Sequence, residues 1–334
     1  MTMDHSVWLD QVKEEPIEPE MPIIDPHHHL WDYPTSRYMV EDLLADTGSG
    51  HNIVQTVFIE CLSMYRPEGP TEMKPVGETE FVRRITTASD GSGTASTRVA
   101  AGIVGFADLT LGGAVKPVLE AHIAAGGGCF RGIRHAASWV ADEGINNAHT
   151  HPPRGLLLDA RFREGFACLS DYKLSFDAWL YHPQIVELAD LARAFPETRI
   201  ILDHVGGVLG IGSFADQKGA VFAQWQKDIE ELAQCENVVV KLGGLGMKVC
   251  GFNWHREEKP PTSEALAEAF APYYHHCIDT FGVERCMFES NFPVDKPSSS
   301  YGVLWNAFKR MSQHLTRTER AALFHDNAAR VYRL

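Results

Sequence analysis

The chain has 334 residues, of which 44% are hydrophobic and 22% are charged. This composition supplies one sizeable core and excludes a disordered or coiled-coil protein. The net charge of −14 repels phosphate backbones, so we expect no nucleic-acid partner. No run of the sequence approaches the roughly 18 uncharged apolar residues of a membrane span, so we expect no membrane association either.

The N-terminal segment and the cysteines indicate a cytoplasmic protein. Residues 1–20 are acidic and lack the basic and apolar regions of a signal peptide. We interpret them as an extension that lies outside a single domain spanning residues 21–334. The seven cysteines are scattered and never form a CxxC pair, which is typical of reduced, buried thiols.

Short β-rich runs alternate with longer amphipathic stretches along the chain. The predicted strands are 23–25, 54–60, 98–105, 129–134, 174–180, 199–204, 237–242 and 286–290. Helical spacing of apolar residues appears between them, for example in 78–89, 114–125, 184–195, 214–234 and 263–281. This alternation predicts a (β/α)8 TIM barrel. An open doubly wound sheet is the alternative, but no GxGxxG motif follows the first strand.

Several of the 16 histidines fall where predicted strands end. The first strand runs into the sequence DPHHH, in which His27 and His29 share a face while His28 points away and is expected to be structural. The fifth strand leads to His182, and the sixth ends at His204. Active sites of such barrels lie at the carboxyl ends of the strands. We therefore expect His27, His29, His182 and His204 to form the active site.

The same imidazoles allow two kinds of chemistry. An HxH pair with a third histidine from another strand can bind Zn²⁺ or a similar ion such as Mn²⁺. Such an ion polarises a carbonyl and lowers the pKa of a bound water to about 7. Without a metal, the imidazoles can hydrogen-bond a carbonyl oxygen directly. The sequence permits both.

Six blocks of sequence, taken in order, resemble the amidohydrolase-2 branch of the amidohydrolase superfamily. They are IIDPHHHLWD, FRGIR, FDAWLYHPQ, LDHVGG, VVVKL and CMFESNFP, and they extend from about residue 22 to the C-terminus. More narrowly, they resemble the lactonase-type members, which include 2-pyrone-4,6-dicarboxylate lactonase and sugar-acid lactonases. The resemblance implies that Arg134, and less directly Arg131, binds an anionic group of the substrate.

One position departs from the family pattern. The last strand of family members usually ends in an aspartate, in a sequence like GSDWP, whereas this chain has Asn291 there. An amide does not titrate and cannot serve as a general base. Glu289 lies two residues earlier on the same face, deeper in the barrel, and can supply the carboxylate. Asp295 is a more distant candidate.

The resulting hypothesis is hydrolysis of a lactone that carries a carboxylate. His27, His29 and His182 would bind the metal or polarise the carbonyl, His204 or Glu289 would activate water, and Asn291 would orient it. The irregular stretches 138–155 and 243–262 would border the pocket, which Trp139, Trp254 and His255 would help to shape. Three further histidines lie in or near these stretches: His135, His149 and His151.

Two other functions remain open at this point. Metal-dependent non-oxidative decarboxylation, found in a sister branch of the family, would use the same histidines. A barrel that binds a ligand without catalysis is compatible with Asn291. In each case the expected partner is a small molecule. A homodimer is compatible with the sequence, since it is the commonest closed assembly.

Overall fold

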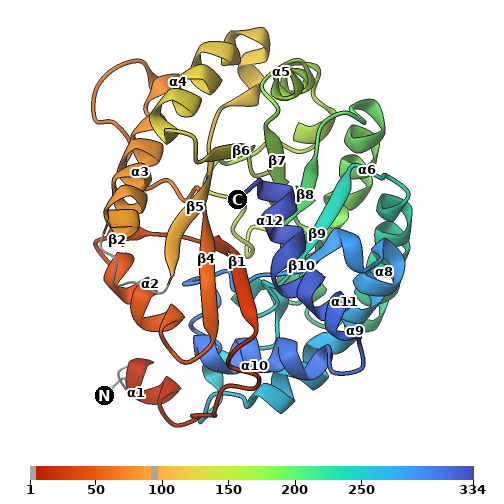
Figure 1. Ribbon diagram of the computed structural model, residues 1–334. Helices are drawn as coiled ribbons and strands as arrows, with labels where there is room; N and C mark the ends of the chain where they lie inside the picture. Colours follow the sequence, from red (N-terminus) through yellow and green to blue (C-terminus); the bar gives the residue numbers. More distant parts are fainter. Residues whose placement is uncertain (1–4, 92–96) are drawn as a thin grey trace.

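The computed structural model describes residues 5–91 and 97–334 (Figure 1). In this part of the chain eight parallel strands are hydrogen-bonded to one another in chain order. They are β1 (Pro22–His28), β4 (Asn52–Ile59), β5 (Arg98–Gly105), β6 (Phe130–Arg134), β7 (Ser175–Ala178), β8 (Ile200–Leu202), β9 (Val238–Leu242) and β10 (Cys286–Phe288). The ring closes where His28 pairs with Phe292, just after β10. The predicted (β/α)8 TIM barrel is confirmed.

Helices surround the strands (Figure 1). The five amphipathic stretches named from the sequence lie in α3 (Val76–Gly91), α4 (Lys116–Gly126), α6 (Ile185–Ala194), α8 (Lys218–Ala233) and α9 (Ser263–Phe281). The remaining α-helices are α1 (His5–Leu9), α2 (Val40–Thr47), α5 (Ala160–Asp171), α7 (His204–Gly207), α10 (Tyr301–Met311), α11 (Arg317–Ala321) and α12 (Asn327–Tyr332). Short 3-10 turns include η2 (Leu109–Val115), η3 (Leu156–Leu158), η4 (His182–Gln184) and η7 (Trp254–Arg256).

Apolar side chains form an inner and an outer layer. Alternation along each strand sends one residue inward and the next outward. In β1, Ile24 belongs to a small cluster with Val57, Val239 and Tyr332, whereas Ile23 belongs to the large cluster that includes the outer helices. α12 lies across the centre of the strand ring (Figure 1), so it closes one end of the barrel.

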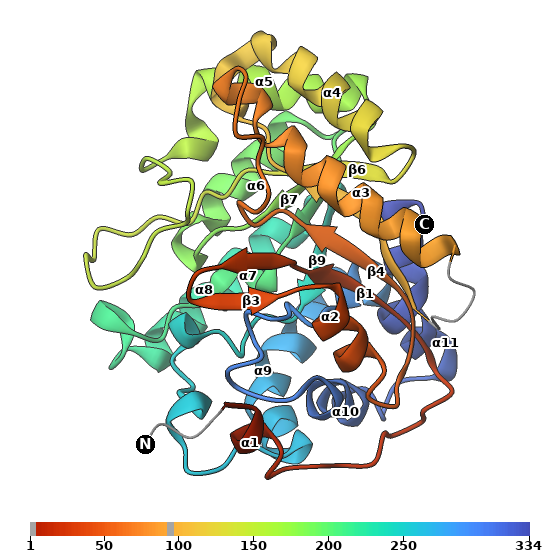
Figure 2. The same cartoon turned by 90° about the vertical axis from the view of Figure 1, so that its left-hand side faces the viewer.

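The opposite end carries the long connections. Figure 2 shows the stretch 138–155 and the hairpin of β2 (Trp31–Tyr33) and β3 (Ser36–Tyr38) at this end, with the C-terminus at the other. The hairpin was not predicted from the sequence. It follows β1 directly and brings two aromatic residues, Trp31 and Tyr33, to the mouth of the barrel.

The N-terminal extension lies against the outside of its own barrel. The carboxylate of Glu14 accepts hydrogen bonds from the backbone N–H of Ser263 (2.7 Å) and from Asn306 (3.1 Å), which lie on α9 and α10. Lys309 on α10 donates to the carbonyls of Ile17 (2.7 Å) and Glu18 (2.9 Å). Within residues 5–91 and 97–334, no helix combines the length and the apolar character needed to cross a bilayer.

Candidate active site

The end of β1 directs its histidines as alternation requires. His27 and His29 point toward the barrel axis and mouth, with their Nε2 atoms 3.2 Å apart. His28 points away: its Nε2 lies 2.9 Å from Oγ1 of Thr56 and its ring packs on Phe58. This agrees with the structural role expected for His28.

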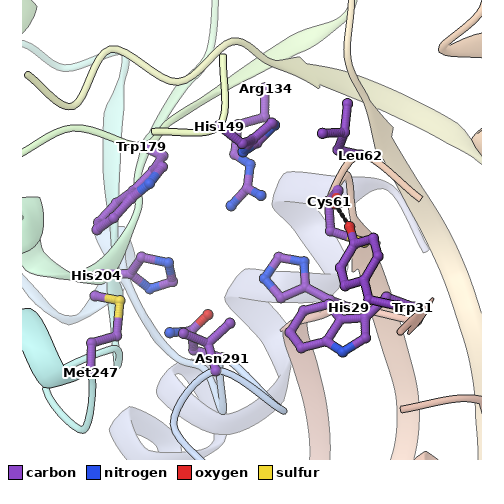
Figure 3. A pocket seen from close by; sticks show the side chains of 12 residues that line it. His29, Trp31, Cys61, Leu62, Arg134, His149, Trp179, His204, Met247 and Asn291 are labelled. Carbon is purple, nitrogen blue, oxygen red and sulfur yellow. Dashed lines mark hydrogen bonds between the residues drawn. The ribbon is translucent and has the colours of Figure 1, made fainter. Parts of the chain in front are cut away.

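A cavity of about 380 Å³ opens at this end of the barrel. Figure 3 shows His29 and Trp31 on one side, Trp179, His204 and Met247 on the other, and Asn291 below. The residues that line the cavity are His29, Trp31, Tyr33, Cys61, Leu62, Arg134, His149, Trp179, His204, Met247, Asn291 and Val294. The sequence analysis predicted several of these residues, but not the apolar and aromatic walls.

Glu289 connects two of the histidines beneath this cavity. Its Oε1 lies 2.6 Å from Nδ1 of His204, and its Oε2 lies 2.8 Å from Nδ1 of His27. Burial alone would raise the pKa of Glu289, but attraction to His204 and His27 outweighs it and holds the pKa well below its usual value. A carboxylate in this position orders both imidazoles, and it lies beneath the cavity rather than in its lining.

The backbone around His204 is unusual. His204 has a φ of 55° and Val205 a φ of 48°, a left-handed conformation that costs about 1–3 kcal/mol per residue and tends to occur at functional sites. The imidazole then lies against the chain after β9, where a Cβ added to Gly244 would stand 2.4 Å from Cβ of His204. A Cβ at Gly243 would stand 2.3 Å from Cγ of Glu289. Glycine at both positions therefore gives His204 and Glu289 their space.

A buried lysine lies below the histidines, and the sequence analysis did not identify it as a site residue. Nζ of Lys241 lies 2.8 Å from Oδ2 of Asp177, 3.0 Å from Oδ1 of Asp203 and 3.1 Å from Nδ1 of His27. Burial would lower the pKa of Lys241, but attraction to Asp177 and Asp203 raises it instead. The available signal was a lysine inside the apolar run VVVKL, because a charge there requires a buried partner.

Arg134 reaches the cavity from the end of β6, as predicted, but its guanidinium is already engaged. Nε donates to Oε1 of Glu60 at 2.7 Å, and Nη2 donates to the backbone carbonyl of Glu60. The other carboxylate oxygen of Glu60 is 3.1 Å from Nε2 of His149. Burial opposes ionisation of Glu60, but Arg134 and His149 outweigh it and lower its pKa to about 2. The guanidinium therefore has little capacity left for a substrate carboxylate.

Three predicted site residues lie elsewhere. His182 begins the turn η4, where its Nδ1 accepts from the backbone N–H of Leu209 (3.3 Å) and its ring packs on Phe214. Arg131 lies near the amino end of β6 and donates to the carbonyl of Gly128 (2.6 Å). Trp254 stacks on Phe252. None of these three lines the cavity, and the contacts of His182 are with Leu209 and Phe214 rather than with His27 or His29.

The asparagine at the end of the last strand pairs with Asp295. Nδ2 of Asn291 donates to Oδ1 of Asp295 at 2.8 Å, and the backbone N–H of Gly246 donates to Oδ2 at 3.0 Å. Oδ1 of Asn291 is buried and has no hydrogen-bond partner among the described residues. Burial raises the pKa of Asp295 to about 7. The amide thus offers an acceptor oxygen at the cavity and uses its donor to hold Asp295.

The contacts of His27 and His29 are compatible with a bound cation. Nδ1 of His29 is 2.8 Å from the carbonyl of Ile59, so this nitrogen carries the proton and Nε2 is a lone pair. If Nδ1 of His27 donates to Glu289, two Nε2 lone pairs converge at 3.2 Å, and either a bound cation bridges them or Nη1 of Arg134, 3.4 Å away, donates to Nε2 of His27. If Nδ1 of His27 instead accepts from Lys241, Nε2–H of His27 donates to His29 and no ion is needed.

Charge and donor type favour the metal-bound arrangement. Oε2 of Glu289 contacts Nδ1 of His27 at 2.8 Å and Oδ1 of Asp203 contacts Nζ of Lys241 at 3.0 Å, whereas Oδ2 of Asp203 lies 3.8 Å from Nη1 of Arg134 and has no hydrogen-bond partner among the described residues. Around them, four carboxylates (Glu60, Asp177, Asp203 and Glu289) surround two cations, Lys241 and Arg134. Two imidazoles on one tetrahedral zinc stand about 3.3 Å apart, given Zn–N bonds of about 2.0–2.1 Å. His27, His204 and Glu289 also present ligand atoms within 4.8 Å of one another. The residues present therefore fit a divalent ion.

Comparisons with known proteins identify the family and the fold. The family model described as Amidohydrolase matches residues 24–334. An uncharacterized protein of Sinorhizobium fredii is 35% identical over 94% of this chain and 99% of its own length. An L-fucono-1,5-lactonase of Burkholderia multivorans is 26% identical over 93% of this chain and 96% of its own. A crystal structure of an amidohydrolase from Burkholderia multivorans with bound zinc has the same fold, with a TM-score of 0.70 at 24% identity, and the match covers 93% of this chain and 99% of that one.

Proposed function

The chain belongs to the amidohydrolase family, and from that premise we propose that it hydrolyses the ester bond of a lactone. The observation that carries the proposal is the contact of Glu289 with both His27 and His204 beneath the cavity. This arrangement gives a histidine base with a carboxylate behind it, next to groups that can polarise a carbonyl. The lactonase name of the Burkholderia relatives supports a cyclic ester as the substrate.

In this proposal His204 activates the water. Its Nδ1 is held by Glu289, so its Nε2 is free to accept a proton at the cavity. The water oxygen bonds to the carbonyl carbon, and the ring C–O bond breaks. The proton held by His204 passes to the departing alkoxide, so the product is an open-chain hydroxy acid. Glu289 stabilises the imidazolium that exists between the two proton transfers.

In this proposal the carbonyl oxygen lies on the opposite side of the cavity, beside His29 and Arg134. A divalent ion held by Nε2 of His27 and His29 would act there as a Lewis acid. The zinc in the Burkholderia crystal structure supports Zn²⁺ as that ion. Nη1 of Arg134 is the guanidinium nitrogen that does not bond to Glu60, and it can donate a hydrogen bond to the developing oxyanion. Oδ1 of Asn291 accepts from the water and orients it.

The test combines a substrate panel with metal analysis. Purified protein is assayed for acid release from five- and six-membered lactones, with CO2 measured in parallel on carboxylated substrates. Metal content is determined by elemental analysis, and activity is compared before and after chelation. We expect ring opening without CO2, about one Zn²⁺ per chain and loss of activity on chelation.

Other outcomes would overturn parts of the proposal. CO2 release instead of a ring-opened acid would identify a decarboxylase. Binding without turnover across the panel would identify a ligand-binding barrel. If metal-free protein opened lactones, hydrogen-bond donors alone would polarise the carbonyl, and the proposed metal would have no role in the reaction. The variant His204→Gln, purified in the same way, controls for contaminating esterases.

A further inference from the structure

A second cavity adjoins the candidate active site. It measures about 260 Å³ and shares Leu62 and His149 with the first cavity. These two side chains therefore stand between the two spaces. Figure 3 shows both of them on the side of the active-site cavity opposite Met247. A substrate bound at His204 with a substituent pointing past His149 would enter the second cavity.

His135 offers a hydrogen-bond donor to this second space. The residue is only 6% exposed and lines the cavity. Burial lowers its pKa to about 4, so the ring is neutral at pH 7. Its Nδ1 accepts from the backbone N–H of Leu109 at 3.3 Å, which places the proton on Nε2. No hydrogen bond to this N–H is found among the described residues, so it is available to a ligand or to water in the cavity.

Asp108 offers an acceptor in the same cavity. Its Oδ1 accepts from the backbone N–H (3.0 Å) and the hydroxyl (2.6 Å) of Thr110, which fixes the carboxylate at the start of η2. Its second oxygen has no hydrogen-bond partner in the described part of the chain and is available to a ligand. The described residues that line the cavity include neither lysine nor arginine.

The two groups together select one kind of ligand. A hydroxyl both accepts and donates a hydrogen bond. Two hydroxyls of one ligand can therefore accept from His135 and donate to Asp108. A carboxylate cannot donate to Asp108 and would meet it as a like charge. An ammonium cannot accept from His135. The active-site cavity reinforces this choice, because its one cation in the described chain, Arg134, is already paired with Glu60.

We propose that the second cavity binds a neutral, hydroxylated tail of the lactone, with Nε2–H of His135 and the carboxylate of Asp108 as its polar contacts. This inference rests on the proposed lactone hydrolysis and specifies its substrate. It also replaces the carboxylate-bearing lactone expected from the sequence. His149 and Leu62 mark the boundary that the tail must pass.

The experiment uses a series of five-membered aldonolactones whose exocyclic tails carry one, two or three hydroxylated carbons. The value of kcat/KM is measured for each with the wild type and with His135→Phe, which keeps a ring against Phe106 and Phe162 but lacks the N–H. We expect the wild type to prefer the longer tails. The variant should reduce that preference about three- to tenfold, the value of one hydrogen bond, mainly through KM. His325→Gln, a variant outside both cavities at a histidine that pairs with Asp326, should leave the preference unchanged.

Binding of erythritol, a neutral four-carbon polyol, gives a readout that requires no turnover. Titration calorimetry should detect weak binding to the wild type that is lost in His135→Phe. Three results would overturn the tail assignment while lactone hydrolysis stands. The wild type could show the same kcat/KM for all tail lengths, His135→Phe could lose kcat/KM equally on all three lactones, or analogues with a carboxylate or amine tail could be opened faster. If no lactone opens, the proposed function fails, and erythritol binding decides separately whether the cavity recognises hydroxyls.

Discussion

Nδ1 of His204 lies 2.6 Å from Oε1 of Glu289, although the two residues are 85 positions apart in the chain. The contact joins the ends of β8 and β10 and leaves Nε2 of the imidazole facing the cavity. A histidine held by a carboxylate in this way has its tautomer and its ring orientation fixed. The proposed chemistry depends on this contact.

Replacing the proposed base should reduce turnover without a comparable loss of binding. His204→Gln keeps a polar side chain but cannot accept and release the proton. We expect kcat to fall by about 10²- to 10⁴-fold with KM changed little, measured as initial rates on the best lactone substrate. His325→Gln, outside both cavities, is the matched control. A loss of kcat smaller than tenfold in His204→Gln would assign the base to another group.

Gly244→Ala should disturb His204 through crowding. The new Cβ would stand 2.4 Å from Cβ of His204, and the backbone φ of +73° already disfavours a side chain. We expect kcat to fall at least tenfold, together with a loss of about 1–3 kcal/mol in the free energy of unfolding. Gly128→Ala separates the two effects, because Gly128 also has a positive φ, +87°, but open space around it. That control should lose stability and keep its kcat; equal kcat values in both variants would contradict the crowding argument.

Exchanging the partners of the Asn291–Asp295 pair should test whether the amide is needed as a donor. Asn291→Asp replaces the amide donor with a second carboxyl group, so the pair keeps a hydrogen bond only while one of the two carboxyl groups is protonated. We expect a loss of about 1–3 kcal/mol in unfolding free energy, measured by urea denaturation at pH 9, above the raised pKa of Asp295. Adding Asp295→Asn restores one donor and one acceptor, and most of the loss should be recovered. If Asn291→Asp alone were as stable as the wild type, the hydrogen bond would contribute little to the free energy of unfolding.

Glu78→Gln should change the dependence of stability on pH. Oε1 of Glu78 accepts from the backbone N–H groups of Cys61 (3.1 Å) and Ser63 (2.8 Å), next to the cavity. Burial, and secondarily Glu60, raises its pKa to about 8. The folded chain thus keeps a proton that the unfolded chain loses above about pH 4.3.

The sign of the effect follows from that difference. The wild type loses stability as pH rises from about 5 to 8, by up to about 1.4 kcal/mol per pH unit, and the glutamine variant lacks this loss. Urea midpoints of the two proteins should therefore diverge with rising pH, with Glu78→Gln the more stable at pH 8. Glu80→Gln on the same helix is the control, since Glu80 pairs with Arg66 at the surface. Parallel pH profiles for wild type and Glu78→Gln would contradict the raised pKa.

The sequence predicts the barrel and part of the site because both follow local rules. Strand ends and alternation predict that His27, His29 and His204 lie close together at one end of the barrel, and the structure has them there with Glu289 in contact with His27 and His204. His182 was placed in the site on the assumption that the fifth strand reaches residue 180. In the structure β7 ends at Ala178, Trp179 lines the cavity instead, and η4 turns His182 toward Leu209.

Other contacts depend on the register between strands, which a single sequence does not show. Lys241 meets Asp177 because the side chains of β9 and β7 reach one another across the interior of the barrel. Glu60 meets Arg134 for the same reason between β4 and β6. The sequence shows each of these charged residues at or inside a strand, but it does not show which residue pairs with which. The second cavity depends on loops whose paths no periodicity specifies.

The junction between β1 and the segment after β10 has a consequence for folding. The backbone N–H of His29 donates to the carbonyl of Phe292 (2.9 Å), and Asp25 accepts from the backbone N–H (2.9 Å) and hydroxyl (2.6 Å) of Ser290, 265 residues away in the chain. Contacts of such sequence separation bear the largest loop-closure entropy and form late. An intermediate with most strands in place would still lack the assembled histidines. Appearance of activity during refolding should therefore report completion of the whole ring, and should lag behind the signals of helix formation.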